Sequence, residues 1–250
     1  MPWYERFGYE SNPFELDPFK SDYTLINHIR LLDDLLYLVR TGNVIIVEGA
    51  DGTGKTMFLK QIVSKFGGKK KICYIDGRKL KQEIDIEQTL NHAGTSIWRS
   101  LVKDKPTELI LLLDNVDALS HSNCEKIKYY FDQGYIKSVV FTTSDYSSLR
   151  ISASLRDRIL RNIIALPPIN AFEAIRIMRE RFSDHFFLSD DIILRIFKLS
   201  HENIKLTLQN CHDICQFVVR EGRGEVQPKY LPLIVKKQTS KRKQVDMVTN

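Results

Sequence analysis

The sequence predicts an α/β fold in which helices cover both faces of a parallel sheet and a small helical domain follows. Three observations support this prediction. Short runs of Val, Ile and Leu alternate with segments of helical periodicity. The runs are continuously apolar, as expected for strands that are buried on both faces of a sheet. After residue 167 the strand pattern stops and only helical patterns remain.

Five apolar runs predict a five-stranded parallel sheet. They lie at 43–49 (NVIIVEG), 71–77 (KICYIDG), 109–114 (LILLLD), 138–144 (SVVFTTS) and 162–166 (NIIAL). Segments with helical periodicity alternate with these strands, as in a three-layer sandwich. These segments lie at 25–40, 55–66, 87–102 and 123–131.

The remaining residues predict a helical domain and a tail. Asn170 stands at an N-cap position, and Glu173 three residues later completes a capping box. A second helix begins in the same way at Ser189, and a third is closed by Gly222. We therefore divide the chain into an α/β core, a helical domain and a basic, disordered tail, over 1–167, 168–232 and 233–250.

Composition indicates a soluble globular protein. The chain has 250 residues, of which 43% are hydrophobic and 27% are charged. No apolar stretch approaches the roughly 20 residues that cross a bilayer. The N-terminus MPWYERFGYE lacks the apolar core of a signal peptide. We therefore expect a cytoplasmic protein without a membrane partner.

The chain is basic, with a net charge of +6 and a pI of about 9.0. The excess of basic residues is concentrated in GGKKK at 67–71 and in KKQTSKRKQ at 236–244. A basic balance favours partners that carry phosphate, but a solvated tail has the same composition. Composition alone therefore leaves DNA binding open.

Four cysteines are too few for a dense disulfide framework. The segment CHDIC places Cys211 and Cys215 on one face of a helix, as in some metal sites. No second ligand pair has zinc spacing, so we expect both to be small buried helix residues.

The segment GADGTGKT at 49–56 matches the phosphate-binding pattern G-x-x-x-x-G-K-[ST], between a predicted strand and a predicted helix. Its glycines let backbone N–H groups face phosphate oxygens, and the helix N-terminus adds its positive dipole end. Lys55 is expected to reach the β- and γ-phosphates, and the Thr56 hydroxyl to bind Mg²⁺. The predicted nucleotide contacts are Gly49, Ala50, Asp51, Gly52, Thr53, Gly54, Lys55, Thr56 and Met57.

A second segment, LILLLDNVDAL at 109–119, ends its strand in Asp114. A carboxylate there can hold Mg²⁺ opposite Thr56. The next residue, Asn115, has an amide that orients water but cannot accept its proton. General-base assistance is worth about 10²- to 10⁴-fold, so we expect slow turnover with nucleotide binding intact. The position after Asp114 would normally offer a carboxylate that polarises the attacking water. Asp117 either substitutes for that carboxylate or caps the following helix.

The segment TTSD at 142–145 argues against GTP as the nucleotide. A guanine-reading motif of the type Asn/Thr-Lys-x-Asp needs a lysine, and Thr143 stands in its place. The segment more simply supplies a polar group at a strand tip that faces the γ-phosphate.

Together these motifs resemble those of the AAA+ ATPases. LDNVDAL is similar to the Leu-Asp-Glu-x-Asp-x-Leu of the origin-recognition and initiator clade. FGYESNPF at 7–14, followed by a helix and TGN, resembles the start of transposition-regulator ATPases. The resemblance covers residues 7–232 and implies a P-loop AAA+ three-layer sandwich with a helical lid.

The resemblance implies roles for further residues. Asn115 replaces the usual catalytic Glu, and Ser144 falls at the sensor-1 position. Arg158, or Arg156 as second choice, takes the place of an arginine finger that completes a neighbouring subunit's site; both would otherwise only solvate a helix. Lys205 takes the place of the sensor-2 arginine, with a solvent-facing lysine as the alternative.

The resemblance also places the nucleotide base between the N-terminal segment and the lid. Pro13, Phe14 and Ile29 are the expected neighbours of the base. Phe14 would alternatively anchor the N-terminal arm in the core.

For the function, the resemblance and the basic balance imply an ATP switch that assembles head-to-tail, as a ring or filament, on or near DNA. Replication initiation, transposition and mobile-element maintenance are the processes implied. Initiators usually carry a winged-helix domain beyond the lid, for which too few residues follow here. We therefore expect DNA contacts that are directed at phosphates and sensitive to salt.

Two rival functions remain. Asn115 and Lys205 also fit a non-hydrolysing nucleotide-binding adaptor whose ATP stabilises an interface with a protein partner. A remodeller of protein partners would need an aromatic-hydrophobic pore loop, and the sequence shows no clear example of one.

Overall fold

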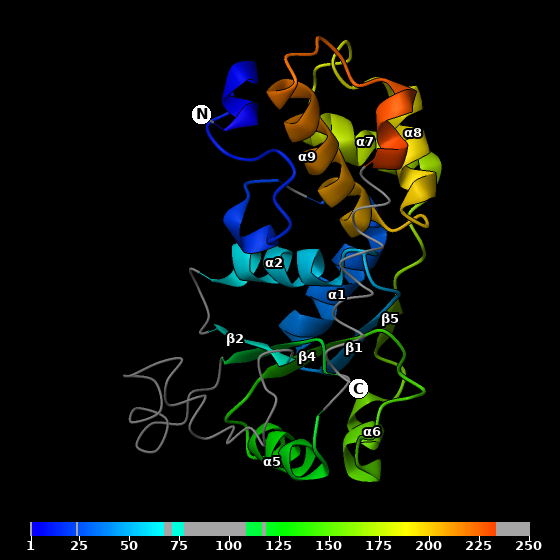
Figure 1. The fold of residues 1–250 in the computed structure, drawn as a ribbon. Helices are drawn as coiled ribbons and strands as arrows, with labels where there is room; N and C mark the ends of the chain where they lie inside the picture. Colours follow the sequence, from blue (N-terminus) through cyan, green and yellow to red (C-terminus); the bar gives the residue numbers. More distant parts are fainter. Residues whose placement is uncertain (1, 24, 68–71, 78–108, 117–118, 234–250) are drawn as a thin grey trace. The chain divides into compact units, whose positions relative to one another are not determined.

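The computed structural model describes residues 2–23, 25–67, 72–77, 109–116 and 119–233 (Figure 1). The chain divides into two compact units. The sheet unit comprises residues 27–167, and the helical unit comprises the residues up to 26 together with those from 168 onward. The predicted helix at 87–102, Asp117 and the tail beyond Leu233 lie outside the described residues.

The sheet unit is built on a five-stranded parallel sheet with the order β2-β3-β4-β1-β5. The strands correspond to the five predicted runs: β1 (Val44–Glu48), β2 (Ile72–Asp76), β3 (Ile110–Asp114), β4 (Ser138–Thr143) and β5 (Ile163–Ala165). The predicted fold class, an α/β sandwich with a parallel sheet, is therefore confirmed.

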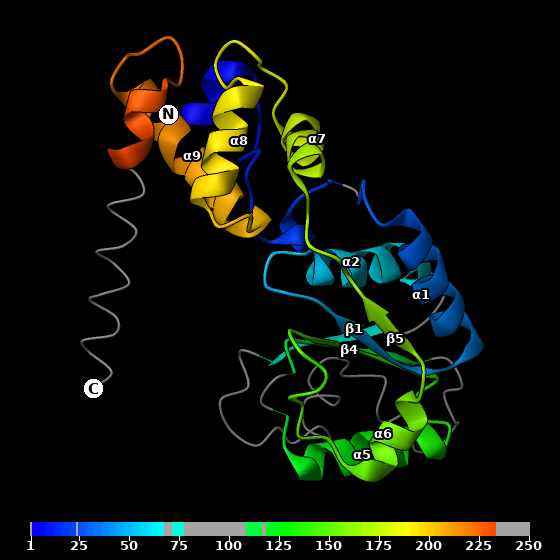
Figure 2. The same ribbon diagram turned by 90° about the vertical axis from the view of Figure 1, so that its right-hand side faces the viewer.

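Helices cover both faces of this sheet, as Figures 1 and 2 show for the described residues. One face carries α1 (Ile29–Thr41) and α2 (Lys55–Phe66), and the other carries α5 (His121–Asp132) and α6 (Ala153–Ile159). Side chains of each strand alternate between the two faces. Val44 and Ile46 join the core beneath α5 and α6, whereas Ile45 and Val47 are buried on the α1 and α2 face. Burial on both faces explains why the strands are continuously apolar.

Helix boundaries differ from the predicted ones where local backbone geometry intervenes. The helix predicted from residue 25 begins at Ile29, because His28 adopts a left-handed conformation with φ of 57°. The helix α5 begins earlier than predicted, since the Ser120 side chain caps it by accepting the Asn123 N–H.

The helical unit contains the three predicted helices, α7 (Ala171–Arg181), α8 (Asp190–Leu199) and α9 (Ile204–Arg220). Each begins at a side-chain cap, from Asn170, Ser189 and Asn203 respectively. Asn170 also forms the predicted capping box with Glu173. None of the described helices has the length and apolar character required to cross a membrane.

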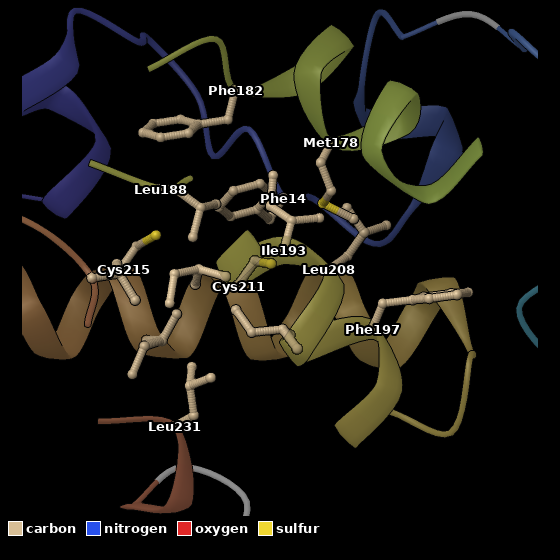
Figure 3. Packing of buried hydrophobic residues seen from close by; sticks show 14 of the residues in the cluster. Phe14, Met178, Phe182, Leu188, Ile193, Phe197, Leu208, Cys211, Cys215 and Leu231 are labelled. Carbon is tan, nitrogen blue, oxygen red and sulfur yellow. The ribbon is translucent and has the colours of Figure 1, made fainter. Parts of the chain in front are cut away.

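The N-terminal segment belongs to the helical unit because its aromatic side chains complete that unit's core. Trp3 stacks on Phe14 with ring centroids 5.8 Å apart. Phe14 in turn packs against Phe182 with ring centroids 5.6 Å apart, and Figure 3 shows these two side chains. The Trp3 indole N–H donates to Nδ1 of His212 at 3.1 Å. The observed division therefore differs from the predicted core over 1–167, since the residues up to 26 pack with the helices that follow residue 168.

Cys211 and Cys215 are fully buried in the same core (Figure 3). Burial raises the pKa of both thiols, so they stay protonated near neutral pH. Within the described parts of the chain, no group of three or more His, Cys, Asp or Glu side chains could hold a metal ion. The prediction that both cysteines are buried helix residues is confirmed.

Replacing Phe182 by alanine is expected to destabilise the helical unit by about 3–5 kcal/mol, because truncating a buried aromatic leaves a cavity. Phe182 is 0% exposed and lies at the centre of the aromatic cluster with Trp3 and Phe14. Phe186→Ala is the matched control, since that side chain is 93% exposed. Urea unfolding followed by tryptophan fluorescence measures both variants, and equal losses of stability would contradict this account of the core.

Candidate functional site

The phosphate-binding loop, residues 49–56, connects β1 to α2. Gly52 and Gly54 have φ of 88° and 99°, a region that L side chains rarely adopt. Gly49 is favoured for a different reason, because a Cβ there would lie 2.7 Å from Thr53 Oγ1 and 3.1 Å from the Leu166 carbonyl oxygen. The first turn of α2 follows the loop directly, so its unpaired N–H groups and positive dipole end face the same space.

Lys55 is the first residue of α2 and is 8% exposed. Its Nζ donates to the carbonyl oxygens of Gly49 and Ala50, at 2.5 and 3.0 Å. These bonds hold the ammonium group against the loop whose N–H groups are expected to bind phosphate. The four-carbon stem lets the same charge follow a bound phosphate.

Thr56 and Asp114 bring together two oxygen ligands from separate elements. The Thr56 Oγ1 donates to Asp114 Oδ2 at 2.8 Å. Asp114 is the last residue of β3, and its side chain is fully buried. Carboxylate and hydroxyl oxygens are the ligands that Mg²⁺ prefers, so this pair fits the ion. Bound there, Mg²⁺ would neutralise charge on the β- and γ-phosphates.

Two further residues complete the surroundings of Asp114: Tyr74, which was not predicted, and Thr142, which lies in the segment expected to supply a polar group at a strand tip. Tyr74 of β2 donates its hydroxyl to Asp114 Oδ2 at 3.0 Å. Thr142 of β4 donates its hydroxyl to Asp114 Oδ1. Both residues lie on predicted strands, but the pattern along one strand does not tell which strands are neighbours. The order β2-β3-β4 is the missing signal.

Asn115 leaves β3 with φ of 57°, in the left-handed region that asparagine tolerates better than most residues. Its N–H donates to Thr142 Oγ1 at 2.8 Å. Its side-chain Nδ2 is buried and has no hydrogen-bond partner among the described residues. The position that follows Asp114 therefore presents an amide with an unused donor.

Ser144 lies just beyond the end of β4 and is exposed. The next residue, Asp145, folds back on its own turn and accepts hydrogen bonds from Ser147 and Ser148. The bonds from Ser148 and Ser147 lower the pKa of the Asp145 carboxyl. The strand-tip hydroxyl that contacts Asp114 is therefore that of Thr142, and the sensor role of Ser144 stays a prediction.

Arg158 lies in the last turn of α6 and is bound to the same chain's α5. Its Nε and Nη2 donate to the two oxygens of Asp132, at 2.8 and 3.2 Å. The bond from Arg158 lowers the pKa of the Asp132 carboxyl. The Arg158 side chain nevertheless stays 46% exposed, so it remains open to exchange its partner.

Arg156 has different surroundings on the same helix. Its guanidinium carbon lies 5.2 Å from the Tyr146 ring centroid. It also donates to the Leu149 carbonyl oxygen at 3.4 Å. These contacts attach Arg156 to the 145–149 turn, while Arg158 is attached to α5.

The other predicted contacts are distributed over both units. Met57 lies in the first turn of α2 and is 9% exposed. Lys205 is the second residue of α9, within the helical unit and half-buried. Phe14 is 1% exposed in the core of the helical unit, which is the anchoring position named as its alternative. The roles of Lys205 and Phe14 at a nucleotide stay predictions.

Solved structures share this fold. The chain is similar to Cdc6p of Pyrobaculum aerophilum, with a TM-score of 0.72 and 15% identity over 85% of this chain and 68% of that chain. It is also similar to Orc1 of Aeropyrum pernix, solved in complex with DNA, with a TM-score of 0.69 and 14% identity over 89% of this chain and 69% of that chain. A third similar structure is domain III of the replication initiation protein DnaA of Thermotoga maritima. Its TM-score is 0.65, and its identity is 17% over 91% of this chain and 97% of that chain. Identities this low show a common fold alone.

The sequence itself also carries a family signature. No curated protein matches the chain at a significant level. Residues 41–175, however, match the family model described as an AAA domain. The matched segment covers more than half of the chain and includes the phosphate-binding loop and Asp114. The protein therefore belongs to the AAA family of ATPases, as its motifs predict.

Proposed function

We propose that the protein is an ATP-dependent switch that binds Mg²⁺ and ATP, hydrolyses ATP slowly and assembles head-to-tail on or near DNA. The observation that carries the proposal is the 2.8 Å bond between Thr56 Oγ1 and Asp114 Oδ2, beside Lys55. It brings a phosphate-binding loop, a lysine and two magnesium-type ligands to one end of the sheet. That set serves a nucleoside triphosphate better than any other ligand class.

Binding follows from groups that are already in place. The N–H groups of residues 49–56 and the dipole of α2 attract the phosphate oxygens. Lys55 adds a point charge that follows the β- and γ-phosphates. Thr56 and Asp114 hold the metal, which supplies charge neutralisation when it is bound.

Slow turnover follows from Asn115. Its amide can hold a water molecule by hydrogen bonds, and its buried Nδ2 has a donor to offer. An amide does not accept the proton that the water must lose, so the step loses the assistance of a base at this position. The nucleotide therefore stays bound for long periods, which suits a switch better than a motor.

Assembly depends on Arg158 in this proposal. Within one chain the arginine pairs with Asp132 at the surface, where ion pairs are weak because water screens them. A phosphate of a neighbouring subunit can therefore replace Asp132 as its partner. One arginine supplied to the next subunit's site generates a head-to-tail contact, which closes into a ring or continues as a filament.

DNA association is supported by charge and by fold. The chain carries a net charge of +6. Two proteins of similar fold are an Orc1 solved in complex with DNA and a replication initiation protein. We therefore propose phosphate-directed contacts with DNA during replication initiation, transposition or mobile-element maintenance, weakened strongly by salt.

A second candidate function is a non-hydrolysing adaptor that keeps ATP as a structural ligand at a protein interface. The amide at Asn115 favours it. Magnesium-dependent phosphate release, measured with and without DNA at high protein concentration, separates the two functions. Turnover that requires Lys55 excludes the adaptor, and no turnover under any of these conditions excludes the switch.

Lys55→Ala is expected to weaken ATP binding by about 10- to 100-fold, because a hydrogen bond to a charged group is worth about 1.5–3 kcal/mol. Titration with a fluorescent ATP analogue measures the loss, with Lys65→Ala on the exposed side of α2 as the control. The variant should also lose ATP-dependent oligomers and DNA association. If both persist unchanged with ATP present, the proposed switch is wrong.

Asn115→Glu is expected to accelerate ATP hydrolysis, by up to about 10²- to 10⁴-fold, because it supplies a general base beside the attacking water. Asn115→Gln is the matched control, since it has the size of glutamate without its carboxylate. Steady-state phosphate release is the measurement. Slower turnover in Asn115→Glu than in the wild type would contradict the role given to this position.

Arg158→Ala is expected to lower turnover at least about tenfold. This is a lower limit, because an arginine finger raises kcat by about 10³- to 10⁵-fold in other nucleotide-hydrolysing enzymes. ATP binding should be retained, and Arg156→Ala should have a smaller effect because its contacts lie at the 145–149 turn.

Mixing two inactive variants tests action in trans. Lys55→Ala keeps its arginine and Arg158→Ala keeps its nucleotide site, so the mixture should recover turnover. A mixture as inactive as its components would show that Arg158 acts within its own chain.

A further inference from the structure

We propose that Asp76, at the end of β2, accepts the proton of the attacking water and so performs the step that Asn115 cannot. The inference deepens the proposed function and rests on ATP being hydrolysed at this site. Strand register, side-chain alternation and the close backbone approach at one glycine support it.

The register of the sheet places Asp76 beside Asp114. The two residues are Cα partners in the parallel pairing of β2 with β3, and each is the last residue of its strand. Neighbouring strands lie about 4.8 Å apart, and paired residues project their side chains to the same face. Two carboxylates therefore end adjacent strands at the edge where parallel sheets bind ligands.

Alternation along β2 identifies the face. Cys73 and Ile75 are buried in the core beneath α5 and α6. Tyr74 and Asp76 therefore project to the opposite face, which carries α2. The Tyr74 hydroxyl confirms this direction, because it donates to Asp114 Oδ2, the atom that also accepts the Thr56 hydroxyl. Asp76 stands two residues further along the same face, toward the end of the sheet.

Gly77 holds the end of β2 against the residue that lacks a carboxylate. A Cβ at position 77 would overlap the Asn115 carbonyl oxygen and would lie 2.8 Å from that of Asp114. Only glycine permits this approach of two backbones. Asp76 is therefore the neighbour in sequence of Gly77, whose backbone contacts that of Asn115.

Two other described carboxylates at this edge of the sheet point away from Asp114. Glu48, at the end of β1, accepts the Tyr146 N–H at 3.0 Å. Asp145 accepts hydrogen bonds from Ser147 and Ser148. Both acids are therefore directed to the 145–148 turn, whereas the β2 face that carries Asp76 is directed to Asp114.

In the proposed step, water attacks the γ-phosphate, and the proton acceptor is Asp76 on β2 and not residue 115. The water oxygen bonds to the γ-phosphorus, and the bond from that phosphorus to the bridging oxygen breaks, its electron pair leaving with ADP. The water proton passes to the Asp76 carboxylate and from there to solvent. Asn115 holds the water by hydrogen bonds.

The test is Asp76→Asn, which keeps the shape of the side chain and removes its basicity. We expect turnover to fall by about 10²- to 10⁴-fold with ATP affinity unchanged. Asp191→Asn on α8, an exposed carboxylate paired with Arg195, is the matched control and should keep the wild-type rate. The double variant Asp76→Asn with Asn115→Glu should recover turnover, because it returns a carboxylate to the attacking water.

Each outcome decides the matter. A rate in Asp76→Asn equal to the wild type would overturn the inference while the proposed ATPase stands. Loss of ATP binding together with turnover, without rescue by Asn115→Glu, would make Asp76 a structural residue and overturn the inference as well. A wild-type chain that releases no phosphate under any condition would instead overturn the proposed hydrolysis itself.

Discussion

The hydrogen bond between Thr56 and Asp114 is the contact on which the rest of the site depends. A fully buried carboxylate is costly unless it is hydrogen-bonded, and Asp114 is satisfied by hydroxyl groups from α2, β2 and β4. The same three bonds fix where those elements end relative to β3. The packing requirement of one buried charge thus sets the positions of Thr56, Tyr74 and Thr142.

The two units of the chain are stabilised by different means. The sheet unit relies on strands that are apolar on both faces, with polar groups confined to the strand ends. The helical unit relies on side-chain caps and on an aromatic cluster that the N-terminal segment supplies. Trp3 and Phe14 thereby connect the first residues of the chain to helices more than 150 positions later. The stability of each unit can therefore be altered by separate substitutions.

Much of this structure could be predicted from local sequence. The five strands, the phosphate-binding loop and the Asn170 capping box depend on neighbouring residues, and they are found where expected. Strand order is different in kind, because periodicity along one strand carries no information about its neighbours. The positions of Tyr74 and Asp76 beside Asp114 depend on that order, so the pattern of a single segment could not identify them. For Thr142, the segment predicted a polar strand tip but not its contact with Asp114. The N-terminal segment was misplaced for a similar reason, since its partners lie far along the chain.

The pairing of Arg158 with Asp132 has a consequence for assembly in solution. An arginine that leaves one anion for another exchanges partners and creates no new ion pair. Dissolved salt screens the old contact and the new one alike, so the two effects largely cancel. In the proposed assembly, the junction between subunits should therefore tolerate ionic strengths that release the protein from DNA, because counterion release makes the proposed DNA binding steeply dependent on salt. Raising the ionic strength would then leave subunits joined to one another after the nucleic acid has gone.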